Sequence, residues 1–385
     1  MARVRSGRVT AVTARRPGVS ELLVALDDEP AAPAAPALAF DAVVGATAVG
    51  ERVVLNTTAV ALGLGTGGWH LVMARLAGPV DDPEGPGHVI KARYTPSQVR
   101  VLAVEEEASP HRDAVAACDG LDGLPVVCAE LHSMVPVVAA AARAAGEAAG
   151  RELAVAYVMT DGAALPLAFS RLAAALRASG LVAGTVTSGQ AFGGDLEAIT
   201  LHSGLLAAKA VLGADVAVAA QGPGGMGTGT RYGFSGTQLA EAVNAVAALG
   251  GRAVACLRMS TADGRARHRG VSHHSLTALG RLALARAAVA VPALDDPALA
   301  AAVQRQLADA GVAARHELVS IRPPDPAGLL ARWGLQVTSM GRGPANDPVF
   351  FAAAAAAGTL AGRLAAGRPA GRNGPAPGRS AGEAP

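Results

Sequence analysis

Residues 215–236 read DVAVAAQGPGGMGTGTRYGFSG and carry the strongest fold signal in the chain. The apolar run Val216–Ala220 predicts a short buried strand. Seven glycines follow between Gly222 and Gly236, and Thr237–Leu249 has the pattern of a helix. A strand that opens into a glycine-rich loop and a helix is typical of anion sites in α/β proteins. Glycine allows close approach of the backbone, and a helix start offers free N–H groups. The stretch therefore predicts where a site lies.

Two familiar motifs fit this loop only in part. Gly222, Gly224 and Gly227 satisfy G-x-G-x-x-G, but the predicted helix starts only after Gly236, and no acidic residue ends the next strand as a dinucleotide fold requires. Thr228 stands where a phosphate-binding loop needs lysine. A standard nucleoside triphosphatase is therefore not expected. Two alternatives stay open: a loop that holds a ligand, or a purely structural connection.

Apolar runs on both sides of the loop alternate with helical patterns. Continuous apolar strands between helices predict a mostly parallel, doubly wound sheet with helices on both faces. The expected strands are Leu124–Leu131, Leu153–Thr160, Leu181–Thr187, Ala214–Ala220, Arg252–Met259, Ala287–Pro292 and Glu317–Ile321, and the helices include Pro166–Ala178, Leu196–Leu212 and Pro297–Ala310. We assign this α/β domain to residues 106–366 and predict that residues 367–385, rich in Gly, Pro, Ala and Arg, form a disordered tail.

Residues 1–105 have a different pattern, in which short strand-like runs are separated by a turn signal about every ten residues. This pattern predicts a small all-β domain, either a β-barrel or a β-sandwich. Two of the runs flank the turn signal Pro17-Gly18. The Ala- and Pro-rich segment Ala31–Ala39 is expected to be a loop.

The composition favours a soluble, cytoplasmic protein. Hydrophobic residues make up 51% of the chain and charged residues 17%, and the net charge of +2 gives no global reason to expect nucleic acid or a membrane as partner. Cys118, Cys128 and Cys256 form no C-x-x-C pair, which indicates reduced thiols. The basic N-terminus lacks the apolar segment of a signal peptide, and the run Phe350–Gly362 is too short to span a bilayer. A homo-oligomer is compatible with the sequence, which identifies no cofactor.

Ligands of such sheets bind beyond the carboxyl ends of the strands, so the residues there are site candidates. Glu130, Asp161 and Arg258 each lie at the end of a predicted strand. The segment with most ionisable residues is 263–275, DGRARHRGVSHHS, whose arginine side chains suit phosphate or carboxylate groups. A solvated basic loop is the alternative interpretation of this segment.

The glycine loop and this basic segment leave consecutive predicted strands at the same edge, so we expect them to close over one ligand. Backbone N–H groups of the loop would hold its anionic group. His268 or His273 is the expected proton carrier, because histidine ordinarily titrates near neutrality, and Asp161 is a third candidate catalyst. The expected ligand-binding residues are Gly222, Gly224, Gly227, Thr228, Gly229, Asp263, Arg267 and Arg269.

No metal site is predicted. Asp263 with His268, His273 or His274 offers suitable atoms, but the spacing of these residues matches no metal motif such as H-E-x-x-H. The adjacent residues His273 and His274 are also expected to point in different directions at the start of a helix.

Five blocks of the sequence together resemble a bacterial family that is known only as a domain of unknown function. The blocks are LNTTAVALGLGTGGWH (55–70), HVIKARYTPSQ (88–98), AELHSM (129–134), AQGPGGMGTGTRYGFSG (220–236) and RHRGVSHHS (267–275). The resemblance extends from the N-terminus to about Phe351. It implies that these blocks belong together, and it supplies no reaction, cofactor or catalytic residue.

The sequence favours a protein that binds a small anionic, phosphate- or nucleotide-like ligand at the strand ends, with transferase or hydrolase chemistry if it is an enzyme. The alternative is a non-catalytic regulatory protein that contacts a protein or nucleic-acid partner through its β-domain. The contact residues would then be Arg3, Arg5, Arg8, Arg15 and Arg16, but no set of aromatic residues for base stacking accompanies them.

Overall fold

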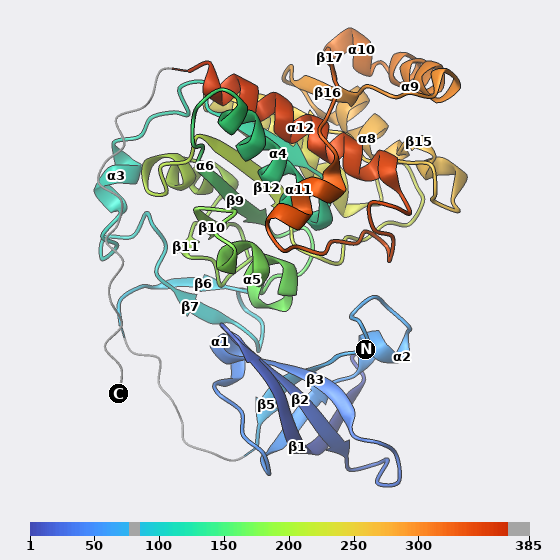
Figure 1. Cartoon of the computed structure of the whole chain (residues 1–385). Helices are drawn as coiled ribbons and strands as arrows, with labels where there is room; N and C mark the ends of the chain where they lie inside the picture. Colours follow the sequence, from blue (N-terminus) through green and yellow to red (C-terminus); the bar gives the residue numbers. More distant parts are fainter. Residues whose placement is uncertain (77–84, 369–385) are drawn as a thin grey trace.

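The computed structural model describes residues 1–76 and 85–368. Figure 1 shows a blue β-barrel at the bottom of the view and a larger α/β part above it. The barrel consists of the first five strands, and the α/β part contains a sheet of eight strands. The predicted fold class is confirmed, and the N-terminal part is a barrel rather than a sandwich.

The barrel is closed, with the strand order β1-β2-β3-β5-β4 and with β4 paired back to β1. Its interior is filled by Val9, Leu22, Val24, Val53 and Leu55, which belong to one buried cluster. The elements of this part are β1 (Val4–Arg16), β2 (Val19–Leu26), β3 (Ala35–Phe40), α1 (Asp41–Val44), β4 (Arg52–Asn56), α2 (Thr58–Ala61) and β5 (His70–Arg75).

The prediction of a loop at Ala31–Ala39 is wrong for the second half of that segment, which forms β3. This strand pairs antiparallel with β2 and parallel with β5. Only Ala37 and Leu38 pair with β5, so Pro36, which has no N–H group, lies outside that ladder. Burial in the barrel core outweighs the loop-like composition here.

A short hairpin of β6 (Val89–Lys91) and β7 (Val99–Val101) follows the barrel and contacts the α/β part. The buried ammonium group of Lys91 donates to the carbonyl oxygens of Ala191 and Ala198, at 3.0 and 2.8 Å. The barrel strands end at Arg75, and the division of the chain near residue 105 stays a prediction. Most of the predicted tail, residues 369–385, lies outside the described residues.

Arg171, the first residue of α5 (Arg171–Ala178), connects the α/β part to the barrel. Its Nε and Nη2 atoms donate to the two carboxylate oxygens of Glu21 on β2, at 3.0 and 2.6 Å. The guanidinium carbon of Arg171 also lies 5.7 Å from the ring centroid of Trp69. The barrel is thus held against the segment that precedes α5.

All eight strands of the large sheet are parallel, in the order β11-β10-β9-β12-β8-β13-β16-β17. Each of the seven predicted strands overlaps one of them. The two-residue strand β11 lies where the helix Leu196–Leu212 was expected to begin, and it is too short to produce a sequence pattern. The strands are β8 (Pro125–Ala129), β9 (Val155–Thr160), β10 (Gly184–Thr187), β11 (Leu196–Glu197), β12 (Val216–Gln221), β13 (Arg252–Cys256), β16 (Ala288–Pro292) and β17 (Glu317–Ile321).

Helices cover both faces of this sheet, as Figure 1 shows. Successive residues of a strand point to opposite faces, so Val127 packs in the cluster with α4 and α12, whereas Cys128 packs with α6 and α7. The remaining elements are α3 (Arg112–Ala116), η1 (His132–Met134), α4 (Val135–Ala148), η2 (Leu167–Phe169), α6 (Leu201–Ala210), η3 (Ser235–Thr237), α7 (Gln238–Ala248), β14 (Met259–Ser260), η4 (Ala266–His268), β15 (Gly270–Val271), α8 (His273–Thr277), η5 (Ala278–Leu282), α9 (Pro297–Asp309), α10 (Val312–Arg315), α11 (Pro326–Arg332) and α12 (Pro348–Ala366).

The order in which the chain adds strands to the sheet reverses at β8: the next strands, β9 and β10, lie on one side of it, and the later strands β13, β16 and β17 lie on the other. The helices α4 and α5 follow β8 and β9 on one face, whereas α7 and α8 follow β12 and β13 on the other face. Neighbouring strands whose following helices lie on opposite faces leave a crevice at their carboxyl ends. The central strands β9, β12, β8 and β13 are such neighbours, so their carboxyl ends are where this fold class binds ligands.

The helix α12 packs along α4 in the core. Among the described residues it is long and apolar enough to cross a membrane, but 72% of its apolar window is buried inside the protein. A Cβ atom on Gly358 would lie 2.2 Å from the carbonyl oxygen of Val138, so the two helices touch through their backbones. These contacts are those of a core helix, and the helix is longer than the apolar run Phe350–Gly362.

Candidate functional site

Polar side chains line the carboxyl ends of the four central strands. Asp161 directly follows β9, Gln221 ends β12, Glu130 directly follows β8, and Arg258 lies two residues beyond β13. Glu130, Gln221 and Arg258 are buried. Buried polar groups cost free energy unless they are paired, so their concentration at one edge of the sheet marks a candidate site.

Glu130 is the centre of this row. Its Oε1 atom accepts a hydrogen bond from Arg258 Nη1 at 2.8 Å and lies 2.5 Å from Nδ1 of His274. Burial alone would raise the pKa of Glu130, but the hydrogen bond from His274 and the charge of Arg258 outweigh burial and lower the pKa below its ordinary value. Glu130 is therefore ionised at neutral pH. Its second oxygen, Oε2, is buried and has no hydrogen-bond partner among the described residues.

The strand ends approach Glu130 closely. A Cβ atom on Gly236 would lie 2.5 Å from Cγ of Glu130, so only glycine fits at this position of η3. Gln221 Nε2 donates to the carbonyl oxygen of Glu130 at 2.9 Å, while Gln221 Oε1 is buried without a partner in the described part of the chain. Two acceptor atoms, Glu130 Oε2 and Gln221 Oε1, are therefore unpaired at this edge.

Three histidines gather beside Glu130. The ring centroids of His273 and His274 are 4.4 Å apart, and that of His268 lies 5.1 and 5.0 Å from them. The two adjacent histidines therefore converge, although the sequence led us to expect them to point in different directions. Ser272 caps the first turn of α8 and also contacts His268, so the preceding chain folds back over that turn.

The pKa values of two of these histidines are far from neutrality. Burial, followed by the positive charges of Arg258 and Arg265, lowers the pKa of His268 to about 3. Burial, followed by the neighbouring His274 and Arg267, lowers the pKa of His273 to about 4. Both imidazoles are neutral at pH 7. A proton carrier works best with a pKa near the working pH, so these values do not favour the predicted proton-transfer role.

The structure brings the glycine loop (residues 222–236) and the basic segment (residues 263–275) together. A Cβ atom on Gly227 would lie 3.4 Å from Cε1 of His274, and one on Gly229 would lie 3.5 Å from Cζ of Arg267. The ring of Phe234, at the end of the loop, stacks on that of His274 with centroids 3.9 Å apart. The expected neighbourhood of the two segments is therefore present.

The other loop residues named from the sequence differ in what they do. Gly222 is a packing residue, because a Cβ atom there would lie 2.7 Å from the carbonyl oxygen of Ala164. The hydroxyl of Thr228 bonds within the loop, 3.1 Å from the carbonyl oxygen of Gly233. Gly224, Gly227 and Gly229 are exposed, and their N–H groups make no hydrogen bond with any described residue. These three N–H groups are available to donate hydrogen bonds to an anion.

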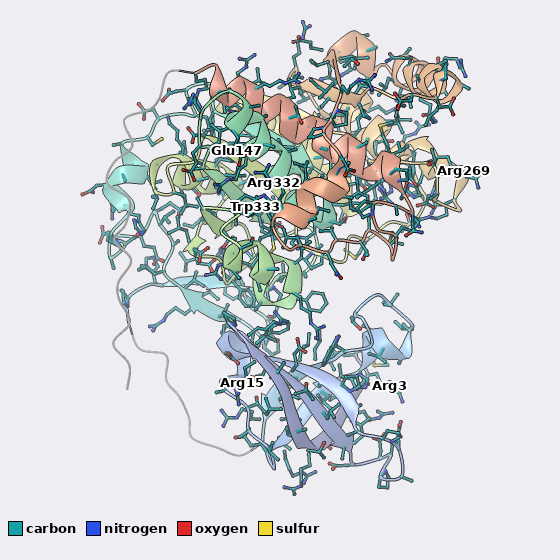
Figure 2. The ribbon with its side chains drawn as sticks, in the orientation of Figure 1. Arg3, Arg15, Glu147, Arg269, Arg332 and Trp333 are labelled. Carbon is teal, nitrogen blue, oxygen red and sulfur yellow. The ribbon has the colours of Figure 1, made fainter. Side chains whose placement is uncertain are left out.

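Asp263 is engaged by arginine side chains, most closely those of its own segment. Its carboxylate accepts two hydrogen bonds from Arg265, at 2.9 and 2.8 Å, and its carbonyl oxygen accepts one from Arg269 Nε at 3.1 Å. The bonds from Arg265 hold the pKa of Asp263 well below its usual value. Arg269 lies on the α/β part, remote from the barrel, as Figure 2 shows. A direct ligand contact is therefore better suited to Arg267 than to Asp263.

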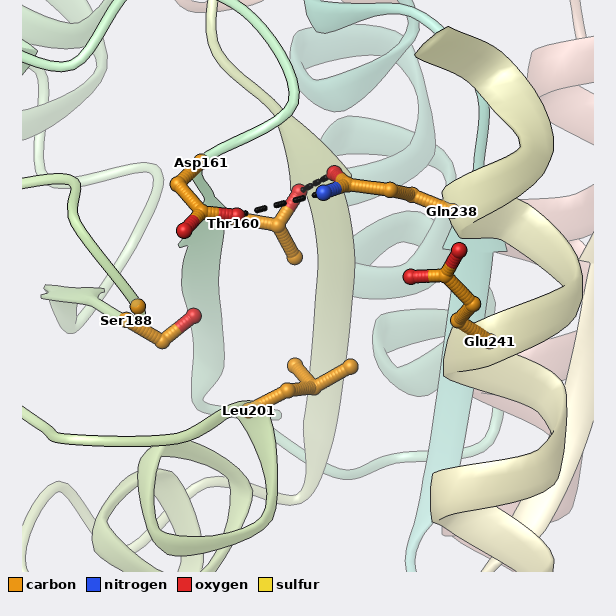
Figure 3. A pocket seen from close by; sticks show the side chains of 7 residues that line it. Thr160, Asp161, Ser188, Leu201, Gln238 and Glu241 are labelled. Atoms are coloured by element: carbon orange, nitrogen blue, oxygen red, sulfur yellow. Dashed lines mark hydrogen bonds between the residues drawn. The ribbon is translucent and has the colours of Figure 1, made fainter.

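Asp161 lines a separate depression at the ends of β9 and β10. Figure 3 shows it facing Gln238 and Glu241 of α7 across the depression, which encloses about 330 Å³ of empty space, partly open to solvent. The Asp161 carboxylate accepts hydrogen bonds from the N–H of Gln190 at 2.8 Å and from Gln238 Nε2 at 3.2 Å. None of the three histidines lines this depression. Asp161 thus belongs to a different part of the edge from His268 and His273.

Sequence reasoning placed Glu130 at a strand end and named His274 as a possible metal ligand, but it gave neither residue a role at the anion site and did not single out Gln221. The position of Glu130 and Gln221 at the ends of apolar runs was a visible signal. Their pairing was not visible, because it depends on which strands become neighbours: β12 enters the sheet between β9 and β8.

Comparison with known proteins gives a family but no activity. No curated protein and no solved structure matches the chain. A family model described as "Protein of unknown function (DUF3866)" matches residues 36–358. This range begins in β3 and ends in α12, so it includes the whole sheet and the candidate site but not β1 and β2. The predicted resemblance to a family of unknown function is confirmed, and the chain belongs to the DUF3866 family.

Proposed function

We propose that this protein binds a small anionic, phosphate- or nucleotide-like ligand between the glycine loop and the basic segment. The observation that carries the proposal is the close approach of Gly229 to Arg267. A Cβ atom added to Gly229 would lie 3.5 Å from the guanidinium carbon of Arg267. The two segments face each other beyond β12 and β13, at the edge where doubly wound sheets bind their ligands.

The donors at this place suit an anion. Arg267 is exposed, and its guanidinium has no hydrogen-bond or ion-pair partner among the described residues. Gly229 lies beside it, and the N–H groups of Gly224, Gly227 and Gly229 on the same loop have no hydrogen-bond partner among the described residues. A guanidinium together with backbone N–H groups is a typical donor set for phosphate or carboxylate oxygens.

Transferase or hydrolase chemistry on the bound group is the reaction class that we infer. Both reactions develop negative charge on oxygen, and fixed donors that are already in place stabilise such charge. Arg267 and the loop N–H groups would supply these donors. The ionised Glu130 and the Arg258 guanidinium lie at the ends of β8 and β13 beneath them.

The alternative, a regulatory protein that contacts a partner through the barrel, has less support. Figure 2 shows Arg3 and Arg15 on the barrel. Each of the five arginines expected to bind nucleic acid already has an intramolecular partner, which a phosphate would have to displace. The pairs are Arg3 with Glu29, Arg5 with Asp28, Arg8 with the Gly50 carbonyl, Arg15 with the Thr47 carbonyl, and Arg16 with Glu21.

We place the protein in the cytoplasm. Cys118, Cys128 and Cys256 are all free thiols, and Cys128 and Cys256 are buried in β8 and β13. Unpaired cysteines are typical of proteins from reducing compartments.

Thermal unfolding with added ligands tests the proposed anion site. The experiment uses the full chain in excess chelator and compares small phosphorylated metabolites with short oligonucleotides. Metabolites that bind the folded state should raise the Tm, and oligonucleotides should not. Stabilisation by oligonucleotides alone would favour the barrel alternative.

Substitution then locates the site. Arg267→Ala should weaken binding of a stabilising metabolite by about 1.5–3 kcal/mol, or roughly 10- to 150-fold, because a charged hydrogen bond is lost. Arg305→Ala removes an exposed arginine on α9 and is the matched control, with affinity unchanged. Gly227→Val should reduce binding more than stability, since the loop is exposed. Unchanged affinity in both Arg267→Ala and Gly227→Val contradicts the proposal.

A further inference from the structure

The three histidines beside Glu130 place their ring nitrogens close together. One nitrogen atom from each of His268, His273 and His274 lies within 4.8 Å of the other two. The three residues come from two short elements, η4 and α8, which the intervening strand β15 connects. Three imidazole nitrogens this close to one another are enough to supply three of the four ligands of one tetrahedral ion.

The hydrogen bonds of the cluster leave one nitrogen of each ring free. An ionised carboxylate only accepts hydrogen bonds, so Nδ1 of His274 carries the hydrogen that faces Glu130 Oε1 at 2.5 Å, and Nε2 keeps its lone pair. The Ser272 hydroxyl, whose oxygen lies 2.8 Å from Nδ1 of His268, can accept a hydrogen bond from it, and in that tautomer Nε2 of His268 keeps its lone pair. Nε2 of His273 is buried and has no hydrogen-bond partner among the described residues.

An unpaired, buried imidazole nitrogen is costly unless something binds it. Here the unpaired nitrogen of His273 lies in the same cluster as the free nitrogens of two other histidines. The contact of His274 with Glu130 is also the arrangement in which a carboxylate holds a metal-bound histidine by its other nitrogen.

We propose that His268, His273 and His274 bind one divalent transition-metal ion of the zinc class through their Nε2 atoms. Glu130 and Ser272 position the rings of His274 and His268. Zinc at about 2.0–2.1 Å from each nitrogen would draw the three atoms to roughly 3.3 Å from one another. Soft thiolate ligands are absent from this cluster, and imidazole ligands favour zinc over calcium or magnesium.

The proposed site leaves one coordination position of the ion unfilled. Three protein ligands leave a fourth position of a tetrahedral ion for water or a ligand, as in catalytic zinc sites. The glycine loop covers this region, since a Cβ atom on Gly227 would lie 3.5 Å from Nε2 of His274. Glycine at position 227 therefore keeps space beside the proposed ion. The metal site does not rest on the anion site proposed above, although the two would be neighbours.

Metal titration of the chelator-stripped full chain tests this proposal without any anionic ligand. We expect Zn²⁺ to bind with a stoichiometry of one per chain in competition with a chromophoric chelator. Co²⁺ in its place should give the intense visible absorption of a four-coordinate ion. Failure of metabolite binding in the chelator-containing assay above would leave this result unaffected, so the two proposals fail separately.

Substitutions identify the ligands. His273→Ala should abolish stoichiometric binding at concentrations that saturate the parent. It removes no hydrogen bond of Nε2 within the described residues, so we expect the metal-free variant to remain folded. Glu130→Gln should weaken Zn²⁺ binding by roughly 10- to 100-fold, as expected for a residue that positions a ligand. His202→Ala, which removes an exposed histidine of α6, is the control and should leave binding unchanged.

Two results would overturn the proposal. The first is the absence of saturable binding of both Zn²⁺ and Co²⁺ by the folded parent chain. The second is stoichiometric binding that survives both His273→Ala and His268→Gln, since the ion would then lie elsewhere. Either result would make the cluster a structural feature that packs against Phe234.

Discussion

The Nδ1 atom of His274 lies 2.5 Å from Oε1 of Glu130, although 144 positions separate the two residues in the sequence. Arg258 donates to the same oxygen at 2.8 Å, so a negative carboxylate at the end of β8 holds both an arginine just beyond the neighbouring strand β13 and a histidine of α8. All three side chains are buried. This contact links the core of the sheet to the candidate site.

Removal of the Glu130 carboxylate should therefore destabilise the metal-free protein. Glu130→Ala leaves the charge of Arg258 buried without a partner, and we expect the free energy of unfolding to fall by about 3–5 kcal/mol. Glu130→Gln retains one acceptor oxygen and should cost less. Urea denaturation in chelator measures both, with Glu241→Gln on α7 as the control for loss of a less buried carboxylate. Equal stability of Glu130→Ala and the parent would mean that the pair contributes nothing to folding.

Much of the fold could be predicted because its signals are local. Seven strands of the sheet are largely apolar runs, and the turn at Pro17-Gly18 separates β1 from β2 as expected. Within the barrel and the large sheet, two strands were missed for a common reason: the two-residue β11 and the Pro-containing β3 are stabilised by their neighbours and not by their own patterns.

The sequence predicted the region of the candidate site but not the contacts within it. Strand ends and glycines indicated which edge of the sheet carries the site, and there Gly229 does lie beside Arg267 and Gly227 beside His274. The convergence of His268 with His273 and His274 depends on how η4 folds back onto α8. No spacing rule in the sequence reports such a contact, which is why a metal site was not expected.

The packing of α12 on α4 should depend on glycine at position 358. A Cβ atom on Gly358 would lie 2.2 Å from the carbonyl oxygen of Val138, so Gly358→Ala must push the two helices apart. We expect a loss of about 1–3 kcal/mol in the free energy of unfolding, in spite of the better helix propensity of alanine. Gly264→Ala is a matched control, because nothing lies within 4 Å of its new Cβ atom. A more stable Gly358→Ala variant in urea denaturation would show that the helices do not touch there.

The buried His132 should make stability depend on pH. Its Nδ1 lies 3.0 Å from the Tyr157 hydroxyl and its Nε2 lies 2.6 Å from the Ser170 hydroxyl. Burial lowers the pKa of His132 to about 4. An unfolded chain, with an ordinary histidine pKa near 6.5, binds a proton first as the pH falls. The contribution of His132 is therefore fully present above pH 6.5 or so, and about 3 kcal/mol of it is lost between there and pH 4.

His132→Gln isolates this effect. The free energy of unfolding is measured for the parent and the variant at several pH values, and the difference between them is plotted, so that other titrating groups cancel. We expect the parent to lose stability relative to the variant as the pH falls from neutrality to about 4. A difference that does not change over this range would mean that His132 is not held neutral in the folded protein.

The buried pair Lys91 and Glu197 should show strong coupling. The ammonium group lies 3.4 Å from the carboxylate, and burial both lowers the pKa of Lys91 and raises that of Glu197. Lys91→Met leaves the carboxylate without its cation, and we expect a loss of about 3–5 kcal/mol. Glu197→Gln in the same chain removes that charge, while its amide can still bond with the N–H of Gly193 and the hydroxyl of Thr187, the present partners of the carboxylate. The double variant should therefore lose at least about 1 kcal/mol less than the sum of the two single losses. Urea denaturation of the parent, the two single variants and the double variant gives the coupling energy. Strict additivity of the two single losses would show that the hairpin of β6 and β7 is not held to the sheet by this ion pair.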